Sequence, residues 1–388
     1  MLSNRIQRVK PSATLAINAK AIELQKQGID ILKFGTGEPD CDTPEHIKDA
    51  AKKALDQGFT KYTATGGIPE LKKAVCEKFK RDNGIDYEPG QVLVSNGGKQ
   101  AIFNCLMALI NPGDEVIIPS PYWVSYADMV NVCEGEPVFV DTTANRFKCT
   151  AAMVEKAITP KTKLVFLNSP SNPTGAVIEK EEIIKIGELA LKHKFYVLSD
   201  EVYEYFTYNG QKSFSLASIP AMKDWVFTVN ATSKTYSMTG WRIGYVAGPK
   251  AVIKAMDDLQ GHSTSNPCSI AQKAALAALT GPQDCVTKMV EEFRKRRDYI
   301  YEVFKSIPGV KLDKPEGAFY IFPDVSAYYK GAITDSFKMA EYLLEKARVA
   351  VVPGGAFGKE GDKCIRMSYA SSMKDIEEGI KRIKAALA

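Results

Sequence analysis

Short apolar runs alternate with helix-length segments of mixed polarity through the middle of the chain. From "VLVSNGG" onward, the apolar runs are "DEVIIPSP", "EPVFVD", "TKLVFLNSP", "FYVLSDE", "WVFTVNA" and "IGYVAGP". Strands that are apolar on both faces are typical of a parallel sheet covered by helices, and segments such as 179–193 are long enough to supply that cover. The pattern therefore predicts an α/β fold with a mainly parallel sheet.

Three helical patterns precede this sheet. A first helix is expected from about Ser12 to Gln27, where Gly28 ends it. The segments "TPEHIKDAAKKALDQG" and "IPELKKAVCEKFKRDNG" each place a proline at the first helical position and a glycine after the last. Proline at the start and glycine at the end are common at helix termini, so both segments are predicted to be helices.

The pattern changes beyond about residue 282. A long charged helix, "CVTKMVEEFRKRRDYIYEVFKSI", is followed by "GAFYIFPD", a helix near 334–347, "VAVVPG", "CIRMSYA" and a terminal helix. Helices mixed with short strands in this order indicate a second, α+β domain. We expect a large domain at 44–281 and a small domain formed by 1–43 and 282–388.

Composition and charge narrow the class of protein. With 388 residues, 45% hydrophobic and 25% charged, the chain fits an ordinary globular protein that is long enough for two domains. The net charge of +5 comes without a basic block, so no nucleic-acid partner is expected. The absence of a signal peptide and of a long apolar run predicts a soluble, cytoplasmic protein without membrane contact. Eight scattered cysteines and three distant histidines predict reduced thiols and no metal site.

Polar residues collect where the predicted strands end. Ligands of a parallel sheet bind beyond the carboxyl ends of its strands. Segments 168–175, 200–203 and 233–242 each follow such an end, and the second domain adds an arginine. The candidate residues are Asn172, Asp200, Tyr203, Ser233, Lys234, Arg242 and Arg366.

These residue types meet the needs of one cofactor. A nucleophilic lysine requires a neutral amine, and an electron-poor cofactor supplies a carbanion sink that no side chain provides. An aspartate beside a pyridinium nitrogen keeps that nitrogen protonated, and a serine with an arginine suits a phosphate. Lys234, Asp200, Ser233 and Arg242 therefore point to pyridoxal phosphate, PLP.

Several motifs carry a family resemblance along almost the whole chain. In order they are "TGEPD", "KYTATGGIPELKKAV", "GGKQA", "SPYWVSY", "NSPSNPTGAV", "SDEVYE", "SKTYSMTGWRIGY" and "IRMSYA". Each alone is weak, since "NPTG" also suits an ordinary turn, but their joint order is specific. The chain resembles the class I PLP-dependent aminotransferases of fold type I. This resemblance implies a large domain with a mainly parallel seven-stranded sheet and a smaller α+β domain.

The resemblance also implies roles at the cofactor ring. Lys234 matches the lysine that bonds covalently to PLP and then moves a proton between substrate and cofactor. Asp200 would pair with the ring nitrogen, Tyr203 and Asn172 would hydrogen-bond the phenolic oxygen, and Trp123 would stack on the ring. The alternative for Tyr203 and Trp123 is a place in the core, and for Asp200 a helix N-cap.

A phosphate site is expected where a helix follows "VLVSN". Gly97, Gly98 and Lys99 open that helix, so their backbone N–H groups would face an anion at its positive end. Ser233 and Arg242 would complete the site.

The resemblance further implies contacts from a second subunit and to the substrate. Tyr62 matches a tyrosine that reaches the phosphate of the neighbouring subunit, which implies a homodimer with shared sites, unless Tyr62 is a plain surface residue. Arg366 matches the arginine that clamps the α-carboxylate, the alternative being a solvated charge at a sheet edge. Gly37 in "TGEPD" would permit close approach of the backbone.

Substrate choice is expected to depend on Lys99 and Thr14. Dicarboxylic substrates need a second cation, and "DDLQGHSTSNP", which supplies an arginine in one branch of the family, has none. The chain looks most like the branch of bacterial-type aspartate aminotransferases, some of which accept prephenate, where Lys99 and Thr14 fill matching positions. We expect ping-pong transfer between aspartate or glutamate and a 2-oxo acid such as 2-oxoglutarate. The alternatives are an enzyme for aromatic amino acids or alanine, a lyase, or a non-catalytic regulator of the same fold.

Overall fold

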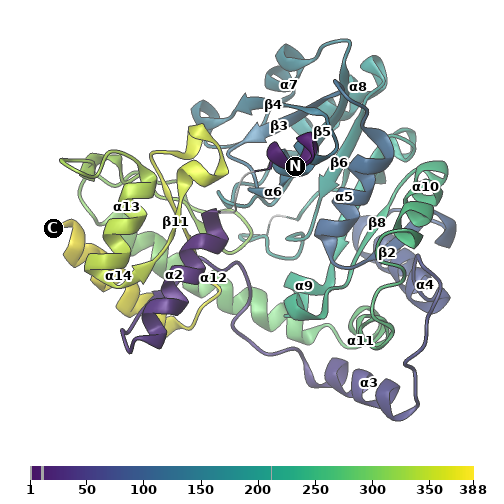
Figure 1. The fold of residues 1–388 in the computed structure, drawn as a ribbon, viewed down its shortest axis with the longest axis horizontal. Coiled ribbons are helices and arrows are strands. Elements are labelled where there is room, and N and C mark those ends of the chain that lie inside the picture. The colour runs from purple at the N-terminus through teal and green to yellow at the C-terminus, as the bar shows by residue number, and fades with distance from the viewer. Residues whose placement is uncertain (1, 10–12, 211) are drawn as a thin grey trace.

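A computed structural model describes residues 2–9, 13–210 and 212–388 (Figure 1). Its main sheet has seven strands in the order β2-β8-β7-β6-β5-β3-β4. The strands are β2 (Val92–Ser95), β3 (Glu115–Ser120), β4 (Glu136–Asp141), β5 (Thr162–Asn168), β6 (Tyr196–Asp200), β7 (Val226–Ala231) and β8 (Gly244–Ala247). The neighbours from β7 to β4 pair in parallel, and β8 is antiparallel to both β2 and β7. The predicted α/β class with a mainly parallel sheet is confirmed.

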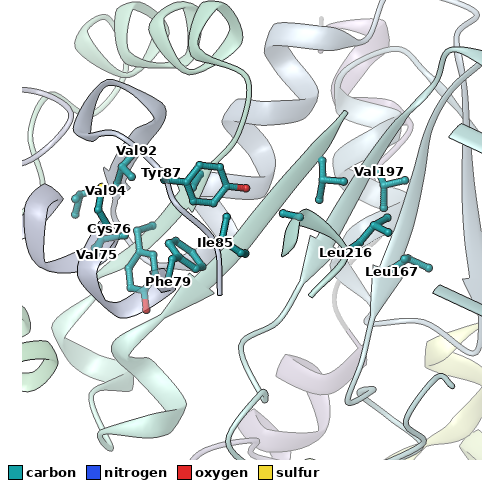
Figure 2. Packing of buried hydrophobic residues seen from close by; sticks show 14 of the residues in the cluster. Val75, Cys76, Phe79, Ile85, Tyr87, Val92, Val94, Leu167, Val197 and Leu216 are labelled. Atoms are coloured by element: carbon teal, nitrogen blue, oxygen red, sulfur yellow. The ribbon is translucent and has the colours of Figure 1, made fainter. Parts of the chain in front are cut away.

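Helices cover both faces of this sheet because successive strand residues point to opposite sides. Leu93 packs in an apolar cluster with α5 (Gly98–Leu109), α6 (Ser125–Val132) and α10 (Lys250–Gly261). Its neighbours Val92 and Val94 pack in a second cluster on the other face (Figure 2). That cluster includes residues of α3 (Glu45–Asp56), α4 (Pro69–Lys78), α7 (Ala151–Ala157), α8 (Lys180–His193) and α11 (Ser269–Thr280). We call these elements together the large-sheet region.

A smaller region is built on a three-stranded antiparallel sheet, β11-β12-β9. Its strands are β9 (Tyr320–Ile321), β11 (Val352–Pro353) and β12 (Ile365–Ser368), and its helices are α12 (Asp284–Lys305), α13 (Ser336–Tyr342) and α14 (Met373–Leu387). From the N-terminal segment, β1 (Leu32–Lys33) pairs in parallel with β10 (Val349–Ala350). This small-sheet region has its own apolar cluster, with Phe34, Phe293, Phe304 and Ile376 among its members.

Helix ends agree with the sequence in most places. α2 (Ala13–Lys26) stops before Gly28, whose φ is +82°, while Ser12 lies outside the described residues. Pro44 is the N-cap of α3 rather than its first residue, so that detail of the prediction was wrong. α4 passes into a π-helical turn, Phe79–Asn83, before Gly84, and α13 likewise passes into Leu343–Ala347.

Short elements complete the chain. α1 (Asn4–Gln7) lies near the N-terminus, and α9 (Thr232–Thr235) follows β7. Short 3-10 turns lie at Pro89–Gln91, Thr143–Asn145, Leu216–Ser218, Pro220–Met222, Thr239–Trp241, Ser326–Tyr328, Gly354–Phe357 and Lys359–Gly361. Among the helices of the described residues, none has the length and apolar character that a membrane crossing requires. The domain limits at 44 and 281 stay a prediction.

Candidate active site

A cavity of about 990 Å³ lies where the carboxyl ends of β5, β6 and β7 face the small-sheet region. Most of the site residues predicted from the sequence line it: Gly37, Gly98, Lys99, Trp123, Asn172, Asp200, Tyr203, Ser233, Lys234, Arg242 and Arg366. These residues are far apart in the chain, and the sheet topology brings them together.

Strand register places Asn172 beside Asp200. Asn168 and Asp200 are partners at the ends of β5 and β6. Asn168 donates from Nδ2 to the Asp200 backbone oxygen at 3.0 Å, and its Oδ1 accepts from the Asn172 backbone N–H at 2.9 Å. One asparagine therefore ties the loop of Asn172 to the strand end of Asp200.

Lys234 lies in the single-turn helix α9, directly beyond β7. Its side chain is partly buried, and Nζ donates to the backbone oxygen of Gly37 at 2.5 Å. Burial lowers the pKa of Lys234 to about 8, and the positive charges of Arg366 and Arg242 act in the same direction, while Glu38 opposes them. A sizeable fraction of this amine is therefore neutral near pH 8, as a nucleophile requires.

Asp200 is buried at the end of β6, and burial raises its pKa to about 6. A hydrogen bond from the Tyr126 hydroxyl to Oδ2, at 2.6 Å, counteracts part of that rise. Asp200 therefore stays mostly ionised at neutral pH, and a cation in the cavity would favour its charged form further. Sequence reasoning missed Tyr126, which is buried, stacks on Phe166 at 4.3 Å and lies one helical turn after Trp123.

Tyr203 meets a second tyrosine that was not predicted. The hydroxyl groups of Tyr203 and Tyr320 lie 2.8 Å apart, and Tyr320 comes from β9 of the small-sheet region. Tyr320 also explains the glycine at position 37, because a Cβ on Gly37 would lie 2.2 Å from the Tyr320 hydroxyl oxygen. The aromatic run "GAFYIF" is the only signal in the sequence that pointed to this residue.

Arg366 is 3% exposed and reaches the cavity from β12. Nη1 donates to Asn172 Oδ1 at 3.0 Å and Nη2 donates to the Gly35 backbone oxygen. Its guanidinium lies 4.6 Å from the Tyr320 ring centre and 5.1 Å from that of Phe357. Among the described residues, the buried Nε of Arg366 has no hydrogen-bond partner, so the group can still donate to a ligand.

The start of α5 forms an anion cradle. Gly97 is its N-cap with φ +86°, and a Cβ there would lie 2.3 Å from Arg242 Nη2. A Cβ on Gly244 would lie 2.2 Å from the Gly98 nitrogen. Glycine at positions 97 and 244 therefore allows Arg242 and β8 to lie this close to the start of α5. The first N–H groups of a helix have no partner within it, and Arg242 and Ser233 add a cation and a hydroxyl.

Lys99 is exposed at the cavity and lies 4.9 Å from the centre of the Trp123 ring. Partial desolvation, together with the charge of Arg242, lowers the pKa of Lys99. Within the described residues, Lys99 forms no salt bridge. Its ammonium is therefore free to meet an anionic ligand.

Three predicted site residues are not among those that line the cavity: Gly97, which caps the start of α5 beside it, Tyr62 and Thr14. Tyr62 is 91% exposed and does not line it, although its loop is firmly held. Gln272 accepts from the Ile68 backbone N–H at 2.8 Å and donates to Thr63 Oγ1 at 3.0 Å. The side chain of Thr14 lies outside the described residues. The roles of all three residues stay predictions.

Comparisons with known proteins match this chain to aminotransferases over most or all of its length. The family model described as "Aminotransferase class I and II" matches residues 29–383. A "Probable aspartate/prephenate aminotransferase" of Rickettsia bellii is 51% identical, covering 100% of this chain and 98% of that protein. The aspartate aminotransferase of Rhizobium meliloti has a TM-score of 0.95 at 44% identity, covering 100% of this chain and 98% of its own. The aspartate aminotransferase of Thermus thermophilus with maleate has a TM-score of 0.94 at 46% identity, covering 100% and 99%.

Proposed function

Because the chain belongs to the class I and II aminotransferases, the family that its ordered motifs predicted, we propose that it moves an amino group between L-aspartate or glutamate and a 2-oxo acid such as 2-oxoglutarate. The observation that supports this most directly is the meeting of Lys234, Asp200 and Arg366 in one cavity. A base with a lowered pKa, a buried carboxylate and a guanidinium whose Nε still has no described partner are the groups that such a transfer uses.

The family implies PLP as cofactor, and the residues present fit it. The glycine cradle at α5 with Ser233 and Arg242 suits the phosphate, and Asp200 suits a protonated ring nitrogen. Tyr203 and Asn172 would hold the phenolic oxygen, and Trp123 would cover one face of the ring. When bound, PLP supplies the electron sink that stabilises charge after Cα loses its proton.

The chain's own groups would bind and move the remaining atoms. Arg366 would hold the α-carboxylate through its guanidinium, whose place is fixed by Asn172 and the Tyr320 ring. Lys234 Nζ, held near the Gly37 oxygen, would accept the proton from Cα and return it during the same half-reaction. Two successive half-reactions, one for each substrate, give ping-pong kinetics.

Lys99 would bind the distal carboxylate of aspartate, glutamate or prephenate, with a smaller part for Thr14. Its free ammonium at the cavity supports this assignment. Relatives bear the name aspartate/prephenate aminotransferase, and the Thermus thermophilus enzyme was solved with maleate, a dicarboxylate. A substrate with two carboxylates would thus meet one cation at each end.

We also propose a cytoplasmic homodimer in which Tyr62 reaches the partner's cofactor site. Tyr62 projects into solvent from a loop that Gln272 holds by hydrogen bonds to Thr63 and Ile68, which supports a contact outside its own chain. The eight unpaired cysteines fit a compartment that keeps thiols reduced. Mixing a Tyr62→Phe chain with a Lys234→Ala chain tests the shared site, because exchange should rebuild one intact site per mixed dimer.

A panel of amino donors with 2-oxoglutarate tests the substrate. Aspartate should give the highest kcat/KM, well above phenylalanine and alanine, and glutamate with oxaloacetate should run the reverse reaction. A preference for phenylalanine or alanine would favour the alternative substrates. Product formation without any 2-oxo acid would favour a lyase, and no turnover with any donor would favour a regulator.

A further inference from the structure

A cluster of buried and half-buried polar side chains lies outside the cavity, between the large sheet and α4. Its centre is an ion pair between Lys78, 1% exposed, and Glu204, 5% exposed. Asn83 and Asn230 donate hydrogen bonds to Glu204, and Asp82 Oδ2 lies 3.9 Å from Lys78 Nζ. All five side chains belong to the described part of the chain, and none of them lines the cavity. The roles proposed above therefore do not account for this cluster.

The Glu204 carboxylate is the common acceptor of the cluster. Oε1 accepts from Lys78 Nζ and from Asn230 Nδ2, the latter at 2.5 Å, and Oε2 accepts from Asn83 Nδ2 at 2.7 Å. Lys78 Nζ also donates to Asn83 Oδ1 at 2.7 Å. The amide of Asn230 is fixed at its other end, because Oδ1 accepts from the Ala231 backbone N–H at 2.8 Å.

The cluster joins segments that carry proposed cofactor contacts. Glu204 follows Tyr203 directly, and its backbone N–H closes a turn onto Glu201, next to Asp200. Asn230 lies at the end of β7, four residues before Lys234. One carboxylate thus links the segment of Asp200 with the segment of Lys234 through a path that avoids the cavity.

Stability is a weak explanation for this arrangement. Removing two charges from water is costly, and a well-packed apolar pair of similar volume is often as stable as a buried ion pair or more so. An apolar pair, however, would not fix direction, whereas a carboxylate with charged and amide donors holds its partners in a defined geometry. The structure makes positional accuracy the stronger explanation.

We propose that Glu204 is a positioning residue for amino-group transfer, which sets the separation between the Asp200 segment and the Lys234 segment through Lys78, Asn83 and Asn230. The proposal rests on the function proposed above for Asp200 and Lys234. It adds that their relative placement is controlled from outside the cavity by residues that touch neither substrate nor cofactor.

Glu204→Gln tests the proposal, because the amide keeps the shape but loses one acceptor oxygen and the charge. We expect kcat to fall about tenfold to a hundredfold, the range that a displacement of about 1 Å produces, with KM for aspartate within about twofold. The pH at which the visible absorption of the bound cofactor changes should also shift. An unchanged kcat and an unchanged absorption profile would overturn the proposal.

The double variant Lys78→Met/Glu204→Met separates positioning from stability. It removes the buried charges, so its melting temperature should match or exceed that of Glu204→Gln. Methionine side chains cannot accept the hydrogen bonds that the amides of Asn83 and Asn230 donate to Glu204, so kcat should stay low. Recovery of kcat to within about threefold of the starting enzyme would overturn the proposal, because a purely structural cluster would then suffice.

Arg297→Met is the matched control. Arg297 is also 1% exposed and donates to Asp298, Asn209 and the Pro315 backbone oxygen, none of which, within the described residues, lines the cavity. The Arg297→Met variant should have a lower melting temperature, with kcat and the absorption profile unchanged. A loss of kcat equal to that of Glu204→Gln would overturn the proposal. Borohydride reduction with peptide mapping checks separately that Lys234 carries the cofactor, so failure of the proposed function is recognised without the Glu204 variants.

Discussion

Lys78 and Lys234 both hold an ammonium group away from bulk water, but their partners differ. Lys78 forms an ion pair with the buried carboxylate of Glu204. Lys234 donates to the neutral backbone oxygen of Gly37, and Glu38 influences it as a nearby charge. Two lysines that are shielded from bulk water thus have different partners: a carboxylate for Lys78 and a backbone carbonyl for Lys234.

The difference shows how one fold gives one enclosed lysine an ion-pair partner and another a neutral hydrogen-bond partner. An opposite charge in contact favours the ammonium form, whereas burial without such a charge favours the neutral amine. Burial lowers the pKa of Lys234 to about 8, so this lysine exchanges its proton near neutral pH. The region around Lys78 uses its charge to join segments, and the region around Lys234 leaves an amine available for chemistry.

The largest expected difference between the two lysines is the loss of activity when Lys234 is removed. Lys234→Ala should lower turnover by roughly 10⁴-fold or more, because nucleophile and general base disappear together. Borohydride reduction and peptide mapping should then find no cofactor on the chain. Lys78→Met serves as the control and should keep the label on Lys234. Labelling of any other lysine in the unmodified enzyme would contradict the assignment.

Lys→Met substitutions in the cofactor-free protein should change stability in opposite directions. Lys78→Met leaves the Glu204 charge unpaired and should cost about 3 kcal/mol or more. For Lys234, the folded pKa of about 8 lies below the usual 10.5, so the unfolded chain binds more protons between these values. Lys234→Met should therefore stabilise the protein below pH 8 by up to about 3 kcal/mol, with the gain shrinking as pH approaches 10.5. Urea unfolding across pH measures both, and equal signs would refute the contrast.

Lys99 sharpens the comparison, because it is an exposed lysine whose described contact is an aromatic ring. If its ammonium binds the distal carboxylate, Lys99→Ala should weaken aspartate and glutamate by about 2 kcal/mol, near the lower limit for desolvated pairs. Phenylalanine never uses this contact, so its kcat/KM should stay level or rise. Equal losses for aspartate, glutamate and phenylalanine would assign Lys99 to the phosphate or the fold instead.

The place of Lys234 at the cavity could be predicted from the sequence, and the burial of Lys78 could not. Lys234 stands in a motif whose order along the chain is specific, and the parallel sheet followed from continuous apolar runs. Lys78 lies in "KKAVCEKFKRDN", which has the pattern of a charged, solvent-facing helix surface. Its burial depends on contact with Glu204, which is 126 residues away.

The same limit explains the other residues that were missed. Tyr126 and Tyr320 make hydroxyl contacts with Asp200 and Tyr203, and Tyr320 also packs against Arg366; none of these contacts leaves a periodic signal. The π-helical turn after α4 was also not predicted, because its residues were assigned to the end of one continuous helix. Local patterns determine elements, whereas these contacts arise only when distant elements pack.

The contrast between the two lysines extends to the carboxylates of Glu204 and Asp200. Substituting Tyr126 tests it through the smallest expected effect. Glu204 receives a cation, whereas Asp200 receives the neutral hydroxyl of Tyr126 at 2.6 Å. Tyr126→Phe removes a donor that lowers the pKa of Asp200, so this pKa should rise further above about 6. A net hydrogen bond of about 1 kcal/mol corresponds to a rise of roughly half a unit to one unit.

The direction of the expected change in PLP affinity for Tyr126→Phe follows from the negative charge that Asp200 must carry to pair with the cofactor. A higher pKa leaves Asp200 partly protonated at neutral pH in the cofactor-free protein. The affinity of the cofactor-free protein for PLP at pH 7 should fall by up to about twofold, because less of Asp200 is ionised, and this loss should shrink at pH 9, where Asp200 is ionised in both proteins. Tyr87→Phe is the control, because Tyr87 is also buried and its hydroxyl meets only Thr228 among its described hydrogen-bond partners. A loss of affinity that is equal at pH 7 and pH 9 would mean that Tyr126 supports the packing of Trp123 and Phe166 rather than the charge of Asp200.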